Sequence, residues 1–190
     1  ASAATDPVKL ATTLDGLRQQ HGKVAGIVHL ASLNSADASD LSIWKQQSSL
    51  QAKSLFWLLQ QTMSELASGP SIALAASRFG GCLGRETEGT SMPQAGAAVG
   101  LFNCATQEIP SLRARLVDFE VEATSQTIVD ALFDELTADD ARTEIGYAEG
   151  VRYGYTHAAE PVSDHPVAPQ LRPDGGWGGP SGGGPRGSTA

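Results

Sequence analysis

The first residues to examine are those that could transfer a hydride to a carbonyl group. In that reaction a Tyr hydroxyl protonates the carbonyl oxygen, a Lys four residues later lowers the pKa of the Tyr, and a Ser orients the substrate. The tyrosines are Tyr147, Tyr153 and Tyr155, and the lysines are Lys9, Lys23, Lys45 and Lys53. Every lysine lies far before every tyrosine, so the chain has no Tyr-x-x-x-Lys motif and lacks this reaction centre.

Glycine-rich turns are the second candidates, because a Gly-x-Gly-x-x-Gly turn between a strand and a helix holds the phosphates of a dinucleotide. The first apolar run continues into "LASLNSADASD", which contains no glycine. Gly80, Gly81 and Gly84 follow the second apolar run, in "RFGGCLGRETEG". A phosphate needs a helix N-terminus close by, and here a long polar segment comes first. We therefore interpret residues 78–94 as a surface loop rather than a cofactor loop.

Acid–base and nucleophilic chemistry has few candidates. His29 ends the run "GIVHLAS", at the strand end where α/β sheets bind ligands, and Asp37 and Asp40 in the next loop could orient it as a general base. A hydrogen-bonded structural histidine is the preferred alternative. Asp118 ends a later strand, where it could hold a ribose but is expected to cap the next helix.

Metal and thiol chemistry find little support. Cys82 and Cys104 show no metal-ligand spacing, and Cys104 lies in a helical pattern that predicts a core thiol. No two of the four histidines have helical ligand spacing, so no metal site is expected. A Gly-x-Ser-x-Gly motif is missing, which argues against α/β-hydrolase chemistry.

Composition narrows the class of protein. The 190 residues carry a formal net charge of −8, which argues against nucleic acid because Lys and Arg carry that binding. No run of 18 apolar residues predicts a membrane span, and the N-terminus lacks the layout of a signal peptide. The two cysteines are expected to be free thiols, which fits a reducing compartment. We expect a cytoplasmic protein.

Hydrophobic periodicity predicts the elements that must position these residues. Helices are expected over 7–21, around Trp44, over 49–66, over 98–109 and over 128–136. Strands are expected in "KVAGIVHLASL", over 71–77 and over 113–120, with a hairpin around Glu149-Gly150. The first strand shows no strict alternation, which predicts burial on both faces.

Alternating strands and helices predict an α/β fold: a three-layer, Rossmann-like, mostly parallel sheet with helices on both faces and right-handed crossovers. From about Ala158 onward, Ala, Pro, Gly, Ser and Asp replace the periodic pattern. We therefore expect one α/β domain over 1–157 and a Pro/Gly-rich flexible tail over 158–190.

The order of several segments resembles the structural subdomain of polyketide synthase ketoreductases. Among these, it is most similar to the type found in iterative polyunsaturated fatty acid synthases. The resemblance covers roughly residues 22–156. It is carried by "GIVHLAS", by "SRFGG", by the block from Gly100-Leu101 through Glu108 and Pro110 to Asp118, and by Glu144-Ile-Gly-Tyr147 through Arg152-Tyr153.

The resemblance implies a truncated Rossmann fold without a cofactor site. Such a subdomain packs on a catalytic subdomain that follows in the chain and carries NADPH, Ser, Tyr and Lys. Leu171-Arg-Pro-Asp-Gly175 fits the lead-in to that subdomain, and Gly182, Gly183 and Gly187 match its cofactor loop faintly. Pro180 and Pro185 remove backbone donors, so the tail is expected to bind no nucleotide. Strands expected upstream, and the catalytic subdomain itself, are missing.

The resemblance therefore implies a non-catalytic subdomain that braces the NADPH-dependent β-ketoacyl reductase of a polyketide or fatty acid synthase. Its partners would be the catalytic subdomain of the same polypeptide and, indirectly, other synthase domains and the acyl carrier protein. One alternative is a stand-alone protein-interaction or dimerisation module. The other is a small α/β enzyme that uses His29 and loop 78–94.

Overall fold

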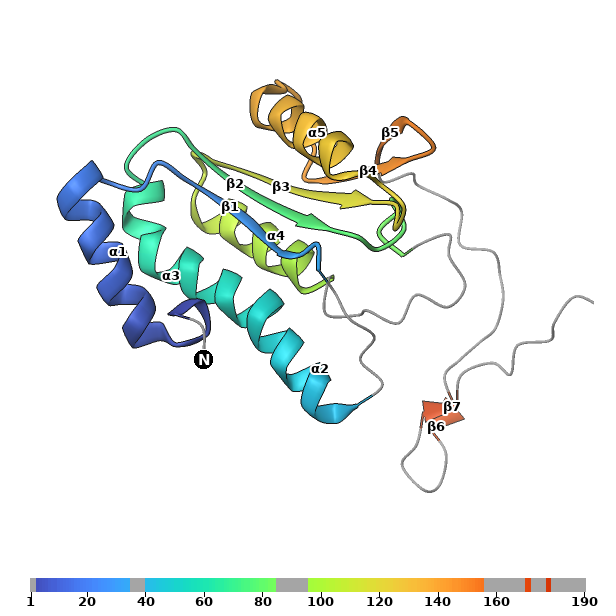
Figure 1. The fold of residues 1–190 in the computed structure, drawn as a ribbon, viewed down its shortest axis with the longest axis horizontal. Helices are drawn as coiled ribbons and strands as arrows, with labels where there is room; N and C mark the ends of the chain where they lie inside the picture. Colours follow the sequence, from blue (N-terminus) through green and yellow to red (C-terminus); the bar gives the residue numbers. More distant parts are fainter. Residues whose placement is uncertain (1–2, 35–39, 85–95, 156–169, 172–176, 179–190) are drawn as a thin grey trace, which may run out of the picture. The chain divides into compact units, whose positions relative to one another are not determined.

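The first part of the chain, Ala1–Tyr155, is built on a five-stranded sheet in the order β1-β2-β3-β4-β5 (Figure 1). The strands are β1 (Gly26–Ser32), β2 (Ser71–Ser77), β3 (Leu112–Phe119), β4 (Glu144–Ala148) and β5 (Val151–Gly154). β1 to β4 run parallel, and β5 pairs antiparallel with β4. This computed structural model describes residues 3–34, 40–84, 96–155, 170–171 and 177–178.

Five α-helices accompany these strands: α1 (Pro7–His21), α2 (Leu41–Ser48), α3 (Ser54–Leu66), α4 (Ala97–Glu108) and α5 (Ser125–Thr137). A 3-10 turn, Ala3–Thr5, precedes α1, and a π-helical turn, Ser49–Lys53, joins α2 to α3. The Asp6 side chain caps α1 by accepting from the amides of Val8 and Lys9, and Pro7 occupies the first helical position.

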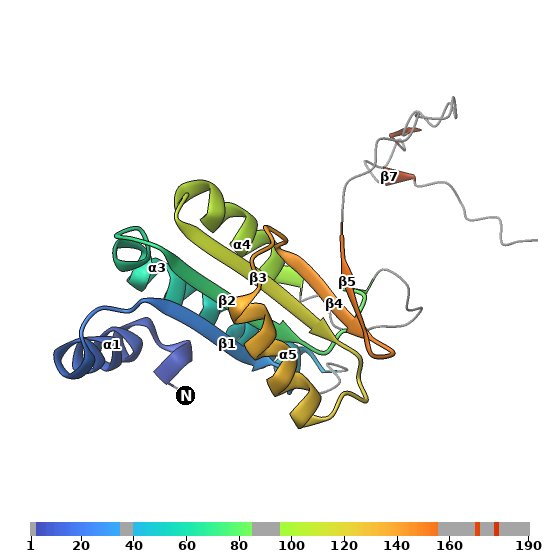
Figure 2. The same ribbon diagram turned by 90° about the horizontal axis from the view of Figure 1, so that it is seen from above.

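The helices cover both faces of the sheet: Figure 1 shows α5 on one side of the strands and α3 and α4 on the other, and Figure 2 looks down on the sheet with α5 in front. On one face, Leu55, Leu59, Phe102 and Ala105 of α3 and α4 pack on β1, β2 and β3. On the other face, Ile128 and Leu132 of α5 pack on β2 and β3. Consecutive residues of β2 and β3 point to opposite faces, so both strands are buried on both sides. The predicted three-layer, mostly parallel α/β fold is confirmed.

The crossovers do not all have the same hand. The chain moves across the sheet in one direction from β1 to β4, with α3 and α4 on one face and α5 on the opposite face. A crossover that moves in the same direction over the opposite face has the opposite hand. The prediction that all crossovers are right-handed is therefore wrong. Because right-handed crossovers are strongly preferred, the two crossovers through α3 and α4 are assigned the right hand and β3–α5–β4 the left hand.

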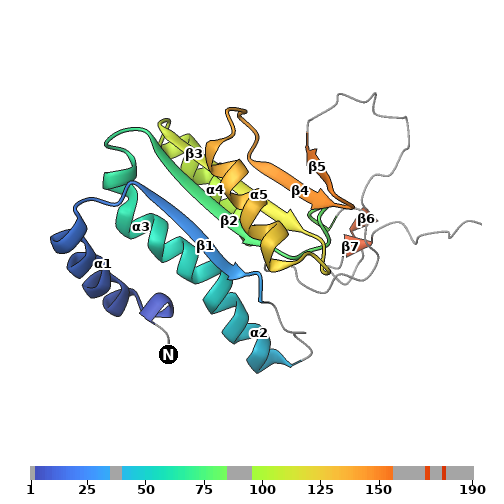
Figure 3. The same cartoon turned by 45° about the horizontal axis from the view of Figure 1, so that its top comes forward.

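The burial of β1 differs from its prediction. Ile27 and His29 are buried on the face of α3, but Val28 and Leu30 are 51% and 45% exposed on the face of α5. β1 is the edge strand, and α5 lies over β2 and β3, so no described helix covers this part of the sheet (Figure 3). A run of apolar residues could not reveal which strand would lie at the edge.

The hairpin between β4 and β5 is confirmed. Glu149 and Gly150 have φ angles of 52° and 73°, so both residues of the two-residue turn are left-handed, as a type I′ turn requires. The second part of the chain, Thr156–Ala190, contains one described pair, β6 (Gln170–Leu171) and β7 (Trp177–Gly178), which run antiparallel. The sequence pattern predicted no strand there. Gly182, Gly183 and Gly187 lie outside the described residues.

Candidate functional site

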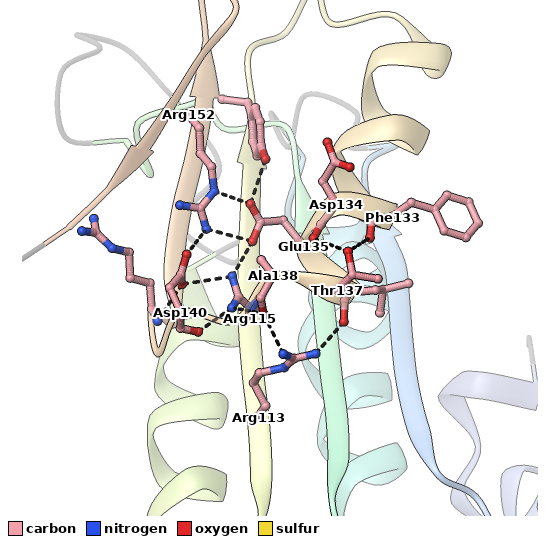
Figure 4. A network of polar contacts seen from close by, with 12 residues as sticks. Arg113, Arg115, Phe133, Asp134, Glu135, Thr137, Ala138, Asp140 and Arg152 are labelled. Atoms are coloured by element: carbon pink, nitrogen blue, oxygen red, sulfur yellow. Dashed lines mark hydrogen bonds and ion pairs between the residues drawn. The ribbon is translucent and has the colours of Figure 1, made fainter.

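A network of charged side chains joins β3, α5 and the β4–β5 hairpin, and Figure 4 shows it at close range. Arg115 and Glu135 are fully buried, and Arg115 Nη1 lies 2.5 Å from Glu135 Oε2. Arg152 contacts the same carboxylate through Nε and Nη2, and the Tyr147 hydroxyl donates to Glu135 Oε1 at 2.8 Å. Asp140 adds a second carboxylate, 3.2 Å from Arg115 and 2.8 Å from Arg152. Two cations thus face two anions.

The network shifts the pKa values of Glu135 and Tyr147 in opposite directions. Burial opposes the charge of Glu135, but hydrogen bonds from Arg152 and Tyr147 outweigh burial and lower its pKa below the usual range. Burial and the neighbouring Glu135 raise the pKa of Tyr147 to about 12. A reductase tyrosine needs the opposite shift, because it must give up its proton near neutral pH. Tyr147 is therefore a structural donor to Glu135.

The glycine loop after β2 folds around an internal carboxylate. Asp118 is fully buried and accepts hydrogen bonds from the Ser77 hydroxyl and from the amides of Phe79 and Leu83, at 2.6, 2.6 and 2.8 Å. Loop amides of this kind form the nests that bind phosphate in other proteins. Here the anion is Asp118 itself, so these two amides are occupied. Asp118 was expected to cap the next helix, but Thr124 caps α5 instead.

The same loop packs tightly against β4. An added Cβ at Gly146 would lie 1.8 Å from the carbonyl oxygen of Gly81, and one at Gly81 would lie 2.3 Å from the carbonyl oxygen of Tyr147. The amide of Gly80 also donates to the carbonyl of Phe119 at 3.2 Å. These contacts explain why the loop needs glycine at Gly81 without any ligand nearby.

His29 is a buried structural histidine in this arrangement. Its Nε2 lies 2.7 Å from the Ser54 hydroxyl, which donates its own proton to the carbonyl of Leu50. Nε2 must then be the donor toward Ser54, so His29 does not act as a base for that hydroxyl. Burial lowers the pKa of His29, more than its hydrogen bond with Leu50 raises it. The contact ties β1 to the first residue of α3.

The remaining candidates do not converge on His29. Asp40 caps α2 by accepting from the Ser42 amide at 2.6 Å, and Asp37 and residues 85–94 of loop 78–94 lie outside the described residues. Cys82 is partly buried, but Cys104 is exposed, so the prediction of a core thiol at Cys104 is wrong. Its place in the helical pattern did not reveal that this side of α4 is uncovered.

Among the described residues, no group of three or more His, Cys, Asp or Glu side chains could hold a metal ion. No helix in the described part of the chain is both long and apolar enough to cross a bilayer.

Comparison with known proteins places the fold in one class. No known protein family and no curated protein sequence matches the chain. Many solved structures match it, and those cited below are named for reductases and dehydrogenases. The chain therefore has a Rossmann-like fold of the short-chain dehydrogenase type.

Three solved structures illustrate that similarity. One is a keto acid-selecting non-ribosomal peptide synthetase module with adenylation, ketoreductase and pseudo Asub domains: TM-score 0.66, 24% identity, 79% of this chain and 12% of that one. An alcohol dehydrogenase from the archaeon Thermococcus sibiricus, complexed with 5-hydroxy-NADP, matches with a TM-score of 0.61 and 14% identity. The match covers 80% of this chain and 74% of the dehydrogenase. A short-chain dehydrogenase/reductase from Brucella melitensis matches with a TM-score of 0.53 and 16% identity, over 63% of this chain and 52% of that protein. The chain spans only a small part of the synthetase module.

The sequence did not predict the ion-pair network, although several of its members lie in segments discussed above. Tyr147 and Arg152 belong to the segment that carried the family resemblance, and both turn out to hold Glu135. Arg115 in an otherwise apolar strand and Glu135 beside apolar helix positions were the available signals. A charged residue at a buried position needs an opposite charge, and only the topology shows where that charge lies.

Proposed function

We propose that this chain is the non-catalytic structural subdomain of an NADPH-dependent β-ketoacyl reductase in a polyketide or fatty acid synthase. The observation that carries the proposal is the engagement of Asp118 with the amides of Phe79 and Leu83. Ligands of α/β sheets bind at the carboxyl ends of the strands, and at this end two amides of the described part of the loop are bound to an internal carboxylate. In this proposal, NADPH and the catalytic Tyr, Lys and Ser belong to a second subdomain of the same polypeptide.

The bracing role requires an apolar surface that a partner can cover. Val28 and Leu30 are about half exposed on the uncovered face of β1, and Val129 and Phe133 of α5 are 46% and 65% exposed. Phe133 points away from Glu135, toward the side of the sheet where β1 lies (Figure 4). We call Val28, Leu30, Val129 and Phe133 the β1–α5 corner. Its apolar side chains fit a partner that buries them, as a packed subdomain interface does.

The solved synthetase module supports the parentage without establishing it. Its description includes a ketoreductase, and it aligns with most of this chain over a small part of its own length. In the proposal, the catalytic subdomain is the direct partner. The acyl carrier protein delivers the β-ketoacyl group to that subdomain and does not bind this chain.

The test is co-expression of this chain with the catalytic subdomain of the same synthase, followed by measurement of co-elution and of β-ketoacyl thioester reduction. The proposal predicts that the pair co-elutes and that the catalytic subdomain loses activity without this chain. Phe133→Asp should weaken the association by about 30-fold, the usual effect of removing a central aromatic contact. Val8→Asp is the matched control, because Val8 is 73% exposed on α1, away from this corner. Equal effects of the two variants, or full activity of the catalytic subdomain alone, would refute the bracing role.

The alternative of a His29 enzyme loses support, since His29 donates to Ser54 and its described neighbours provide no carboxylate for it. The alternative of an interaction module has a specific observation in its favour, an apolar groove between α3 and α4 that includes Phe56 and Leu101.

A further inference from the structure

Two carboxylates border the β1–α5 corner on the outer side of α5. Asp130 and Asp134 are both exposed, and we call them the acidic border. Residues three and four positions apart are neighbours on the surface of a helix, so Asp130 lies beside both Phe133 and Asp134. Figure 4 shows Asp134 pointing away from Glu135. The most exposed aromatic side chain of the corner therefore lies next to negative charge.

No described side chain neutralises the acidic border. Asp130 accepts a hydrogen bond from the side-chain amide of Gln126 at 2.8 Å, and neither carboxylate forms an ion pair within the described residues. The arginines that contact α5 are engaged elsewhere. Arg115 and Arg152 bind the carboxylates of the buried network, and Arg113 donates to carbonyl oxygens at the end of the helix. A cation for the acidic border has to come from outside this part of the chain.

The acidic border is unfavourable for α5 by itself. Like charges four residues apart on a helix repel each other. Asp134 also lies in the last turn of α5, where a negative side chain opposes the helix dipole. A neutral or positive residue at either position would suit the isolated helix better. Local choices that disfavour the isolated structure are expected where a chain serves a function, such as binding a partner.

Charge separates two kinds of partner for the corner. A second copy of this chain would bring its own acidic border into the same interface, because a two-fold contact uses one surface twice. The net charge of −8 adds repulsion between copies. A surface that carries arginine or lysine around an apolar centre complements both the exposed apolar side chains and the carboxylates.

We infer that the partner of the β1–α5 corner presents basic side chains to Asp130 and Asp134, which attract the partner and fix its orientation. The inference rests on the proposed function, in which that partner is the catalytic subdomain. Charges at the rim of an interface mainly raise the rate of association, whereas most contacts at its centre act on the rate of dissociation. Phe133 and the acidic border therefore have separate tasks, since Phe133 holds the complex and the carboxylates accelerate its formation.

The experiment measures the rate constants of association and dissociation between this chain and the catalytic subdomain of the same synthase. Asp130→Asn/Asp134→Asn should slow association about tenfold at low salt, with little change in dissociation. Salt at about 0.5 M should remove most of this difference, because it screens charges at the rim. The matched control is Glu108→Lys, which changes the net charge by the same amount on the exposed surface of α4 and should leave association unchanged. The urea midpoint of the Asn variant should not fall, since the substitution relieves repulsion within α5.

The outcomes distinguish a basic docking surface from the bracing role itself. If a complex forms but the Asn variant associates as fast as the wild type, or no slower than Glu108→Lys, the inference is overturned and the bracing role stands. If the wild-type chain forms no complex with the catalytic subdomain, the proposed function fails and the inference fails with it. Light scattering of the chain alone tests the other partner. A dimer that Phe133→Asp dissociates would assign the corner to a second copy and overturn the inference.

Discussion

Tyr147 donates its hydroxyl to the buried carboxylate of Glu135 at 2.8 Å, which connects the hairpin of the sheet to α5. Arg152, on the other strand of the hairpin, binds the same carboxylate, and Arg115 reaches it from β3. A tyrosine held in this way keeps its proton, since its pKa is raised to about 12. Tyr147, the residue type that donates a proton in hydride transfer to a carbonyl, thus holds the sheet to α5.

Glu135→Gln should therefore destabilise the chain strongly. The substitution removes the charge that compensates buried Arg115, and breaking a buried ion pair from one side costs about 3–5 kcal/mol. Urea unfolding monitored by circular dichroism measures this free energy. The matched control is Asp134→Asn on the exposed side of the same helix, which should change it by less than about 0.5 kcal/mol. Similar effects at the two positions would contradict the role of the network.

Asp118→Asn should loosen the loop that follows β2. A neutral amide replaces the carboxylate that accepts from Phe79, Leu83 and Ser77, and charge-assisted bonds contribute about 1.5–3 kcal/mol. Hydrogen exchange should show faster exchange at the amides of Phe79 and Leu83, with little change at α1. Unchanged exchange at both amides would show that Asp118 does not hold the loop.

Gly146→Ala should destabilise the chain by about 1–3 kcal/mol. The new methyl group would overlap the Gly81 carbonyl oxygen and push β4 away from the loop that follows β2. Gly16→Ala provides a control of opposite sign. Gly16 lies inside α1 with nothing within 4 Å of an added Cβ, so alanine should stabilise the helix by about 0.5–1 kcal/mol. Thermal unfolding of both variants separates the two cases, and a neutral Gly146→Ala would refute the close contact.

His29 predicts a pH dependence of stability. Its folded pKa lies below the ordinary value of 6.5, so the unfolded chain binds the proton first as the pH falls, and stability decreases from about pH 6.5 downward. His29→Gln removes this contribution, and its free energy of unfolding should fall less than that of the wild type between pH 7.5 and 5.5. Glu135 has a depressed pKa as well, but its effect appears only below its ordinary value of 4.5. Parallel pH profiles of the two proteins would contradict a buried neutral His29.

Local chemistry predicted much of the fold. The apolar periods and the Glu149-Gly150 turn marked elements that the structure contains with small shifts of their ends. Alternating strands and helices were sufficient for a parallel three-layer sheet. The lack of a Tyr-x-x-x-Lys motif followed from residue order alone, with no need for a structure.

Long-range relations could not be predicted in the same way. Exposure of Val28 and Leu30 depends on β1 being the edge strand, and exposure of Cys104 depends on which side of α4 meets the sheet. The opposite hand of β3–α5–β4 follows from the face that α5 covers. Asp118 and Glu135 bind partners 35–41 and 12–20 residues away, so their roles appear only when the strands and helices are assembled.

The most direct test of the central claim is a fluorescence titration of the full chain with NADPH. If the chain is a non-catalytic structural subdomain, the titration should show no saturable binding in the micromolar range, and Asp118→Asn should not create it. Saturable binding with micromolar affinity by the wild-type chain would contradict the claim that the cofactor belongs to a partner subdomain.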